Sequence, residues 1–339
     1  MPNNSTKILL LLTLVGGTLI SISSNSWLGV WMGLEINLLS FIPLMSTTKN
    51  MFTSEASLKY FLIQALASST LLFLVVMKTI LESIPMFANS LSSFLIVIPL
   101  LLKSGVAPFH WWFPSVMEGL NWMNCFILMT IQKIAPLILT SYLFSMTPIS
   151  MIFILSTVTI GAMGGFNQIS TRKILTYSSI NHLGWMLAAI LLGKNIWLTY
   201  FTIYTILTLT IILTLNKHKI SFINQLTSMN HKTETKFIML SLLLSMGGLP
   251  PFLGFFPKWI VIQHMILNNL TITSTVLVLA SLVTLYYYLR ICYLTFLITY
   301  IKTKWFNWPT KMNFQTLNLF LASLSTMGLM LCTMMINFY

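Results

Sequence analysis

The chain has 339 residues, of which 56% are hydrophobic and only 7% are charged, and its formal net charge is +13. Soluble domains carry roughly 25% charged residues, so this composition excludes an ordinary water-soluble protein and indicates that lipid is the solvent. The 18 basic residues are spread thinly among hydrophobic segments, without the clustered basic patch of a nucleic-acid-binding protein.

Hydrophobic segments long enough to cross a bilayer recur along the whole sequence. A bilayer core needs about 20 apolar helical residues, and eleven segments meet this requirement. The sequence therefore predicts an all-α polytopic membrane protein with about eleven transmembrane helices. In chain order, the predicted spans are 5–23, 26–46, 55–78, 90–119 (interrupted), 122–144, 148–170, 173–192, 196–216, 236–268 (interrupted), 273–300 and 315–337.

Positive charges mark one side of these predicted helices. If the amino terminus defines the inside, two basic residues, Lys78 and Lys194, lie outside and eleven lie inside. The inside residues are Lys7, Lys49, Arg172, Lys173, Lys217, Lys219, Lys232, Lys236, Lys302, Lys304 and Lys311. Loops on the side of synthesis are enriched in Lys and Arg, so the amino terminus is predicted inside and the carboxyl terminus outside.

Two predicted spans contain proline pairs that a continuous helix does not tolerate. PFHWWFP runs from Pro108 to Pro114, and PFLGFFP runs from Pro251 to Pro257. Proline lacks a backbone N–H and its ring clashes with the preceding turn. Because an unsatisfied carbonyl is costly in hydrocarbon, a broken helix survives only against protein or a wet cavity. Transporters keep their ion paths at such breaks.

The two motifs have a common spacing of 143 residues, which also separates Gly105 from Gly248. This spacing predicts an internal repeat. The fourth and ninth spans are five helices apart, so equivalent segments would enter the membrane from opposite sides. We therefore expect inverted five-helix repeats over 1–145 and 148–300, followed by a basic loop and a carboxyl-terminal helix over 301–339. The alternative is a chance similarity between two kinks rich in Pro and Phe.

Six ionisable residues lie well inside the predicted spans. They are Glu35, Lys103, His110, Lys133, His182 and Lys258. A charge at mid-bilayer costs at least ~2.5–3.5 kcal/mol, so such residues should face the protein interior, find a partner or titrate. Two charges ~8 Å apart interact by about 2 kcal/mol at an effective dielectric of ~20. A change in the distance between Glu35 and Lys103 would thus bias the proton on a lysine further along, as in a proton relay.

Each of these residues also has a purely structural interpretation. Glu35 and Lys103 would form a static pair that ties two helices together. His182 would donate to a backbone carbonyl, and His110 would satisfy carbonyls freed at the break. The static pair leaves Lys133 and Lys258 without visible acidic partners.

Other features of the sequence give no sign of a catalytic or cofactor site within this chain alone. Glu55 and Lys59, at i and i+4 near a helix end, are expected to form a local pair. The three cysteines are isolated in apolar segments and indicate packing. The sequence contains no P-loop, no dinucleotide-binding fingerprint and no cluster of metal ligands.

Several segments together resemble one protein family over nearly the full length of the chain. They are SNSWLGVWMGLEINLLSFIPL, EASLKYFLIQALAS, LLKSGVAPFHWWFPSVMEGL, IQKIAPL, TRKILTYSSINHLGWM and GGLPPFLGFFPKW. The chain is similar to the chain 2 family of mitochondrial NADH–ubiquinone oxidoreductase (respiratory complex I), in its shortened animal form. That family in turn resembles the Mrp-type sodium/proton antiporters.

The resemblance implies a subunit of a proton-translocating oxidoreductase, with two inverted units packed among other membrane-arm subunits and lipids. It implies the mitochondrial inner membrane, with the amino terminus in the matrix and the carboxyl terminus in the intermembrane space. NAD, FMN, iron–sulfur clusters and ubiquinone are expected in partner subunits, and no cofactor or metal in this chain. The absence of a cleavable signal and of an Arg-rich presequence suggests synthesis within the organelle.

The resemblance also implies roles for individual residues. The family's buried glutamate corresponds to Glu35, and its three lysines correspond to Lys103, Lys133 and Lys258. His110 and His182 fall in family motifs as further members of a relay. Two other functions remain open from the sequence, a free-standing cation/proton antiporter and a purely structural membrane subunit.

Overall fold

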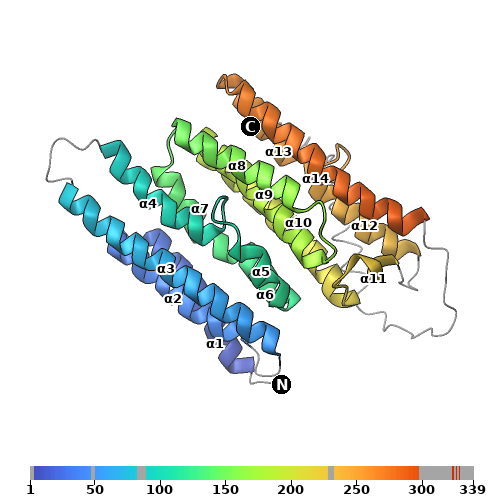
Figure 1. Cartoon of the computed structure of the whole chain (residues 1–339), viewed down its shortest axis with the longest axis horizontal. Coiled ribbons are helices and arrows are strands. Elements are labelled where there is room, and N and C mark those ends of the chain that lie inside the picture. Colours follow the sequence, from blue (N-terminus) through green and yellow to red (C-terminus); the bar gives the residue numbers. More distant parts are fainter. Residues whose placement is uncertain are drawn as a thin grey trace. The chain divides into compact units, whose positions relative to one another are not determined.

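The computed structural model describes residues 4–46, 50–81, 89–227 and 233–297, and the single residues 323, 326 and 328. Within these residues the fold is all-α, as predicted, and contains no β-sheet (Figure 1). The chain divides into two compact units, Met1–Phe153 and Ile154–Tyr339. The predicted eleventh span, 315–337, lies outside the described residues apart from those three positions.

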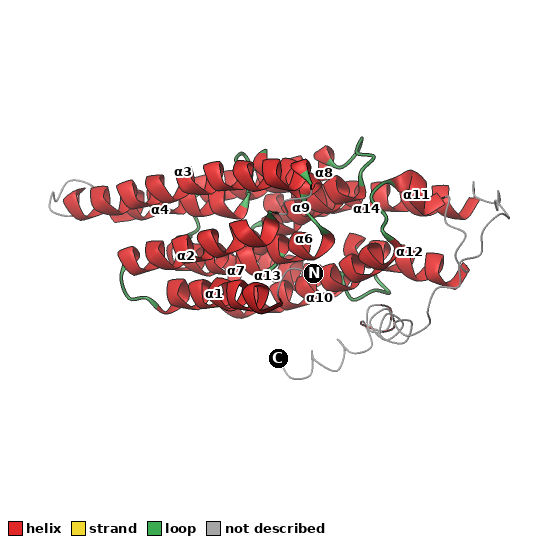
Figure 2. Cartoon of the chain, turned by 90° about the horizontal axis from the view of Figure 1, so that it is seen from below, coloured by secondary structure: helices red, strands yellow, loops and turns green. Residues whose placement is uncertain are grey.

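In the first unit, the predicted fourth and fifth spans are each divided into two helices, α4 with α5 and α6 with α7. Its helices are α1 (Asn4–Ser23), α2 (Trp27–Met45), α3 (Met51–Leu81), α4 (Asn89–Ser104), α5 (Trp112–Gly119), α6 (Trp122–Met129), α7 (Ile131–Leu143) and the start of α8 (Pro148–Gly164). Helix α3 packs against α2, α4 and α5, and Figure 2 shows it alongside α4. Helix α4 also packs against α7, and buried hydrophobic residues of α2, α3, α4 and α7 form one core cluster.

Helices α1 and α2 lie unusually close because glycine faces backbone at their crossing. A Cβ atom at Gly17 would lie 2.8 Å from the Asn37 backbone nitrogen, and one at Gly33 would lie 2.5 Å from the Ser21 nitrogen. Small residues let helix backbones approach in this way in membranes, where van der Waals packing holds helices together. The close crossing fixes α2, which carries Glu35 and Asn37.

The second unit is built around α9. Its described helices are the rest of α8, α9 (Thr171–Leu192), α10 (Lys194–His218), α11 (Ile223–Thr227), α12 (Thr233–Gly247), α13 (Phe255–Leu267) and α14 (Thr271–Leu297). Every residue from Ser178 to Ile190 of α9 is buried, and α9 packs against α10, α13 and α14. Polar side chains on α9 therefore face other helices.

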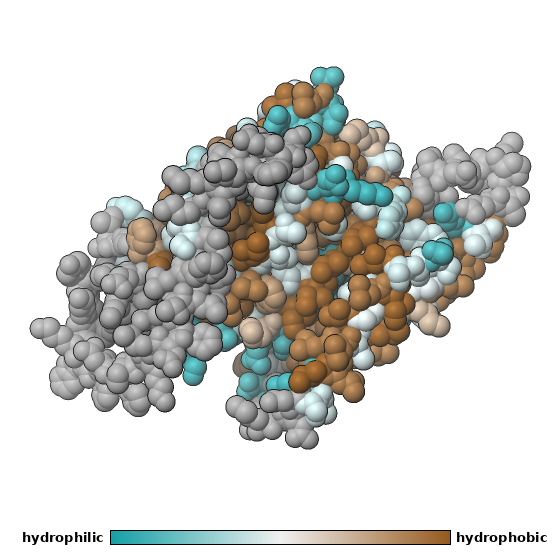
Figure 3. Space-filling view, turned by 180° about the vertical axis from the view of Figure 1, so that it is seen from behind, coloured by the Kyte–Doolittle hydropathy of each residue, from teal (hydrophilic) through white to brown (hydrophobic). Residues whose placement is uncertain are grey.

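The outer surfaces of the helices are suited to lipid. Seven described helices are long and apolar enough to cross a membrane. The large hydrophobic residues Leu62, Leu66 and Leu279 are 60%, 63% and 62% exposed, respectively. Hydrophobic side chains form broad patches on the face seen in Figure 3. The structure supports a polytopic membrane protein, whereas the count of eleven spans stays a prediction.

Both predicted interruptions are present and have the same layout. Helix α4 ends at Ser104 and α5 begins at Trp112, while α12 ends at Gly247 and α13 begins at Phe255. All four boundaries keep the 143-residue spacing of the motifs. Just past each first half-helix, Gly105 and Gly248 take φ values of 78° and 82°, a left-handed conformation that glycine adopts without steric cost. The inverted sense of the repeat stays a prediction.

The predicted span over 122–144 is confirmed as one apolar segment long enough to cross a membrane, Trp122–Leu143. Its helix has an irregular turn at Thr130, between α6 and α7. The Thr130 backbone has ψ −75°, and its carbonyl accepts from the Lys133 amide at 3.0 Å. Pro136 lies inside α7 and has no N–H for the carbonyl four residues earlier. Lys133 therefore lies in the first turn of a new helix rather than within a continuous one.

Candidate functional site

The carbonyls freed at the first break are satisfied by groups inside the protein. The Leu101 carbonyl accepts from the Gly105 and Val106 amides at 3.1 Å each. The indole Nε1 of Trp112, from beyond the break, donates to the Leu102 carbonyl at 3.2 Å. The Gln64 side chain of α3 donates to the Lys103 carbonyl at 3.3 Å. The break is thus stabilised by protein donors rather than exposed to hydrocarbon, as an interrupted span requires.

A polar cavity lies beside Lys103, between α2, α3, α4 and α7. Its polar lining comes from Asn37, Tyr60, Gln64, Lys103 and Gln132. Its free space is sufficient for about one water molecule. The Lys103 ammonium is a donor only, whereas the amide and phenol oxygens are acceptors. The cavity therefore offers a charged lysine a polar surrounding that the bilayer lacks.

Three side chains of this cavity are linked by hydrogen bonds. The Gln132 amide nitrogen donates to the Asn37 Oδ1 at 2.9 Å, and the Tyr60 hydroxyl donates to the Gln132 Oε1 at 3.3 Å. Asn37 and Tyr60 are each 3% exposed. We call Asn37, Tyr60 and Gln132 the amide cluster. Because Gln132 precedes Lys133 in α7, the cluster connects the cavity at Lys103 with the backbone that carries Lys133.

Glu35 and Lys103 do not form a direct ion pair. No salt bridge within 4.0 Å joins these two described residues, whereas Lys59 and Glu55 do form one. Glu35 lies on α2 and is only partly buried. The static pair that we considered from the sequence is therefore not formed at salt-bridge distance.

Lys133 is among the most deeply buried side chains in the first unit. It is 2% exposed, and its Nζ lies 4.8 Å from the centre of the Phe113 ring. An ammonium over an aromatic face gains electrostatic stabilisation, more so when it is removed from water. Phe113 belongs to α5, so the break in α4–α5 supplies part of the surroundings of Lys133.

Lys258 reaches back across the second break. It lies one turn into α13, is 4% exposed, and its Nζ donates to the Gly247 carbonyl at 2.8 Å. That carbonyl is at the carboxyl end of α12, where the helix dipole favours a cation. The Trp185 ring of α9 has its centre 5.9 Å from the same Nζ. Lys258 points into the protein, as a functional intramembrane lysine should.

The two histidines have different surroundings. His110, inside the first break and 5% exposed, has its Nδ1 3.3 Å from the Pro108 carbonyl oxygen. This contact agrees with the structural interpretation of His110. The Nδ1 of His182 on α9 is 2.9 Å from the Tyr200 hydroxyl of α10, and its ring lies 5.3 Å from that of Tyr204. His182 thus contacts a buried hydroxyl rather than only the backbone carbonyl that we considered.

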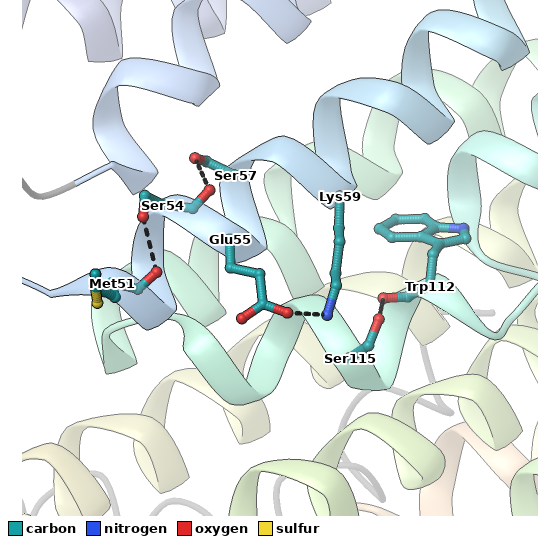
Figure 4. Close-up of polar contacts among 7 residues, drawn as sticks. All are labelled: Met51, Ser54, Glu55, Ser57, Lys59, Trp112 and Ser115. Atoms are coloured by element: carbon teal, nitrogen blue, oxygen red, sulfur yellow. Dashed lines mark hydrogen bonds and ion pairs between the residues drawn. The ribbon is translucent and has the colours of Figure 1, made fainter.

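The Glu55–Lys59 pair is confirmed as a local surface pair. Figure 4 shows the two side chains pointing toward one another from α3, and the Lys59 Nζ is 2.6 Å from the Glu55 Oε1. Their side chains are 61% and 46% exposed, respectively. With Ser115 and Glu118 of α5, they line an open groove at the amino-terminal end of α3. An exposed pair of this kind contributes little to stability.

Together, the predicted residues form two groups, one in each unit. Glu35, Lys103, His110 and Lys133 lie in the first unit, and His182 and Lys258 lie in the second. The amide cluster and the tyrosines beside His182 were not predicted from the sequence. A usable signal was present, because amide side chains at 37 and 132 occur in otherwise apolar helices, next to a predicted acid and a predicted lysine. Among the described residues, no group of three or more His, Cys, Asp or Glu could hold a metal ion.

Comparison with known proteins identifies the family to which this chain belongs. A model described as "NADH:quinone oxidoreductase/Mrp antiporter, TM" matches residues 24–284. The NADH-ubiquinone oxidoreductase chain 2 of Anopheles gambiae is 50% identical over 331 residues, which are 96% of this chain and 96% of that protein.

Two solved structures share the fold. A chain of respiratory complex I from Thermus thermophilus with bound aureothin gives a TM-score of 0.82 at 22% identity, over 96% of this chain and 78% of that one. A chain of the Mrp complex from Dietzia sp. DQ12-45-1b gives 0.71 at 19% identity, over 84% and 59%. Because the family model covers most of the chain and the mosquito relative matches it almost end to end, this chain belongs to the NADH:quinone oxidoreductase/Mrp antiporter family of membrane proteins.

Proposed function

We propose that this chain is a membrane-arm subunit of NADH–ubiquinone oxidoreductase that couples quinone reduction in partner subunits to proton translocation. The observation that carries the proposal is the burial of three lysines inside apolar helices. Lys103, Lys133 and Lys258 are 7%, 2% and 4% exposed, respectively. A buried intramembrane cation is energetically costly, so such residues usually mark a functional site. The 50% identity to a chain 2 protein supports a function in coupling.

The proposed path runs through the predicted ionisable residues. Glu35 and Lys103 form a switchable pair, Lys133 stores a proton, and Lys258 connects toward the outside. His110 and His182 serve as further stations. A shift of charge at Glu35 changes the electric field at Lys103. The amide cluster keeps the distance between Lys103 and Lys133 constant. The two inverted repeats, 1–145 and 148–300, each supply one broken helix to this path.

The proposal assigns the redox chemistry to other chains. NAD, FMN, iron–sulfur clusters and ubiquinone are held by partner subunits, and this chain contacts other membrane-arm subunits and lipids. It lies in the mitochondrial inner membrane with its amino terminus in the matrix and its carboxyl terminus in the intermembrane space. The excess of basic residues on the amino-terminal side supports this orientation.

The assembly itself can be tested by mild detergent extraction and native electrophoresis. We expect the chain to migrate with a large respiratory assembly that contains NADH dehydrogenase activity. The fold shared with the Mrp chain supports a second candidate, a cation/proton antiporter that acts without redox partners. That candidate predicts a small species free of dehydrogenase activity, and such a result would contradict our proposal.

The amide cluster provides a test within the site. Replacing Gln132 with methionine removes two hydrogen bonds at nearly constant volume, and we expect proton pumping by the assembled complex to fall about tenfold. The expected size corresponds to the net contribution of one or two buried hydrogen bonds. The measurement is the ratio of protons pumped to NADH oxidised in membrane vesicles.

A matched control for this variant is available in α13. Gln263 is exposed and does not line the cavity, so Gln263→Met makes the same chemical change at an unrelated residue and should leave the ratio unchanged. An unchanged ratio in Gln132→Met, with the complex fully assembled, would show that the amide cluster has no part in coupling.

A further inference from the structure

The two broken helices place their lysines on opposite sides of the break. Lys103 is in the last turn of α4, before the break, whereas Lys258 is in α13, after it. At the 143-residue spacing, the counterpart of Lys103 is Met246 and the counterpart of Lys258 is Ser115. Lys258 can bind the carboxyl end of α12 only by folding its side chain back over the break.

The space for this folded position comes from Gly248. A Cβ atom at Gly248 would lie 2.9 Å from the Lys258 Nζ, 3.1 Å from its Cδ and 3.2 Å from its Cε. A Cβ atom rarely lies this close to another heavy atom that is not bonded to it, so any larger residue would displace the end of the lysine. A lysine side chain is flexible, and it would yield before the backbone does. Displacement would take Nζ away from the Gly247 carbonyl that it binds at 2.8 Å.

We propose that Gly248 is a positioning residue for Lys258, which leaves the room that its ammonium needs to dock on the Gly247 carbonyl. The proposal rests on the proposed function for the role of Lys258 in proton transfer. In the docked position, the ammonium takes the place of a missing backbone donor at the end of α12 and is held in a defined place. Glycine at this position therefore serves the lysine as well as the turn.

The first break supplies a matched control. Gly105 has nearly the same left-handed conformation, φ 78° against 82°, so alanine is strained equally at both positions. A Cβ atom at Gly105 would contact Phe113 and Trp112 at 3.5 Å, an ordinary van der Waals distance. The strain is common to Gly105→Ala and Gly248→Ala, and only the second touches a lysine.

The test compares Gly248→Ala, Gly105→Ala, Lys258→Met and the double variant Gly248→Ala/Lys258→Met in the assembled complex. We expect Gly248→Ala to lower proton pumping about tenfold, the effect of one charge-assisted hydrogen bond, and to move the pH profile of pumping. Gly105→Ala should not shift the pH dependence of proton pumping. Apart from the loss by backbone strain, which Gly105→Ala measures, the double variant should pump no less than Lys258→Met alone, because the rest of the effect of Gly248→Ala passes through Lys258.

A high-resolution map of the Gly248→Ala complex completes the test. We expect the Lys258 Nζ to be displaced from the Gly247 carbonyl. An Nζ that stays docked, or a double variant whose losses simply add, would overturn the proposal. If Lys258→Met pumps normally, the proposed function of Lys258 fails, while displacement of Nζ would still show that Gly248 positions it.

Discussion

Replacing Lys133 with methionine is expected to lower proton pumping by the assembled complex about 30-fold or more. A charge ~8 Å from another ionisable group contributes about 2 kcal/mol at an effective dielectric of ~20, and this energy corresponds to roughly 30-fold in an equilibrium. Methionine keeps most of the apolar stem of the side chain but removes the ammonium, and with it the cation–π contact with Phe113. The measurement is pumping in membrane vesicles, normalised to the amount of complex on a native gel.

Lys59→Met is the control for this prediction. Lys59 is exposed and paired with Glu55 on the same helix, and surface pairs of this kind are worth ~0–1 kcal/mol. Pumping and assembly should be unchanged. Normal pumping by a fully assembled Lys133→Met complex would remove Lys133 from the path and favour a purely structural role for the buried lysines.

Replacing Gly17 with leucine is expected to prevent stable packing of α1 on α2. A Cβ atom at Gly17 would lie 2.8 Å from the Asn37 nitrogen and 3.0 Å from the Gly33 carbonyl oxygen, and neither backbone atom can yield locally. Overpacking costs about 1–3 kcal/mol and occasionally more, and leucine against backbone on both sides belongs at the upper end of this range. The chain level and the thermal stability of the complex should both fall, as measured on native gels after graded heating.

The neighbouring glycine provides the control. A Cβ atom at Gly16 would meet nothing within 4 Å, so Gly16→Leu makes the same substitution one residue earlier and should be tolerated. Equal stability of the two variants would mean that α1 and α2 are not held at this crossing. Asn37 would then owe its place in the amide cluster to other contacts.

The breaks were predictable because their cause is local and chemical. Proline removes a backbone donor, and the proline pairs Pro108/Pro114 and Pro251/Pro257 marked the interruptions, whereas a single proline such as Pro136 lies inside a helix. The positions of Gly105 and Gly248 followed from the common spacing. The burial of Lys103, Lys133 and Lys258 was predictable for a similar reason, since a charge in an apolar helix has to face protein. These inferences needed no knowledge of which helices are neighbours.

The amide cluster and the interruption at Thr130 were not predictable in this way. Asn37, Tyr60 and Gln132 come from three helices, and nothing in their spacing tells that they meet. Thr130 carries no strong helix-breaking signal, and Pro136 lies six residues later. The docking of Lys258 on the Gly247 carbonyl depends on the path of the chain through the break, which the sequence does not reveal.

The unequal lengths of the helices have a consequence for the surrounding lipid. Helix α3 has 31 residues, so it is about 46 Å long, enough to pass through the acyl core and both headgroup layers of a bilayer. Helix α8 has 17 residues and is about 25 Å long, shorter than the ~30 Å acyl core. Where α8 faces lipid, the bilayer has to thin locally to match it, and phospholipids with shorter acyl chains fit best at that helix.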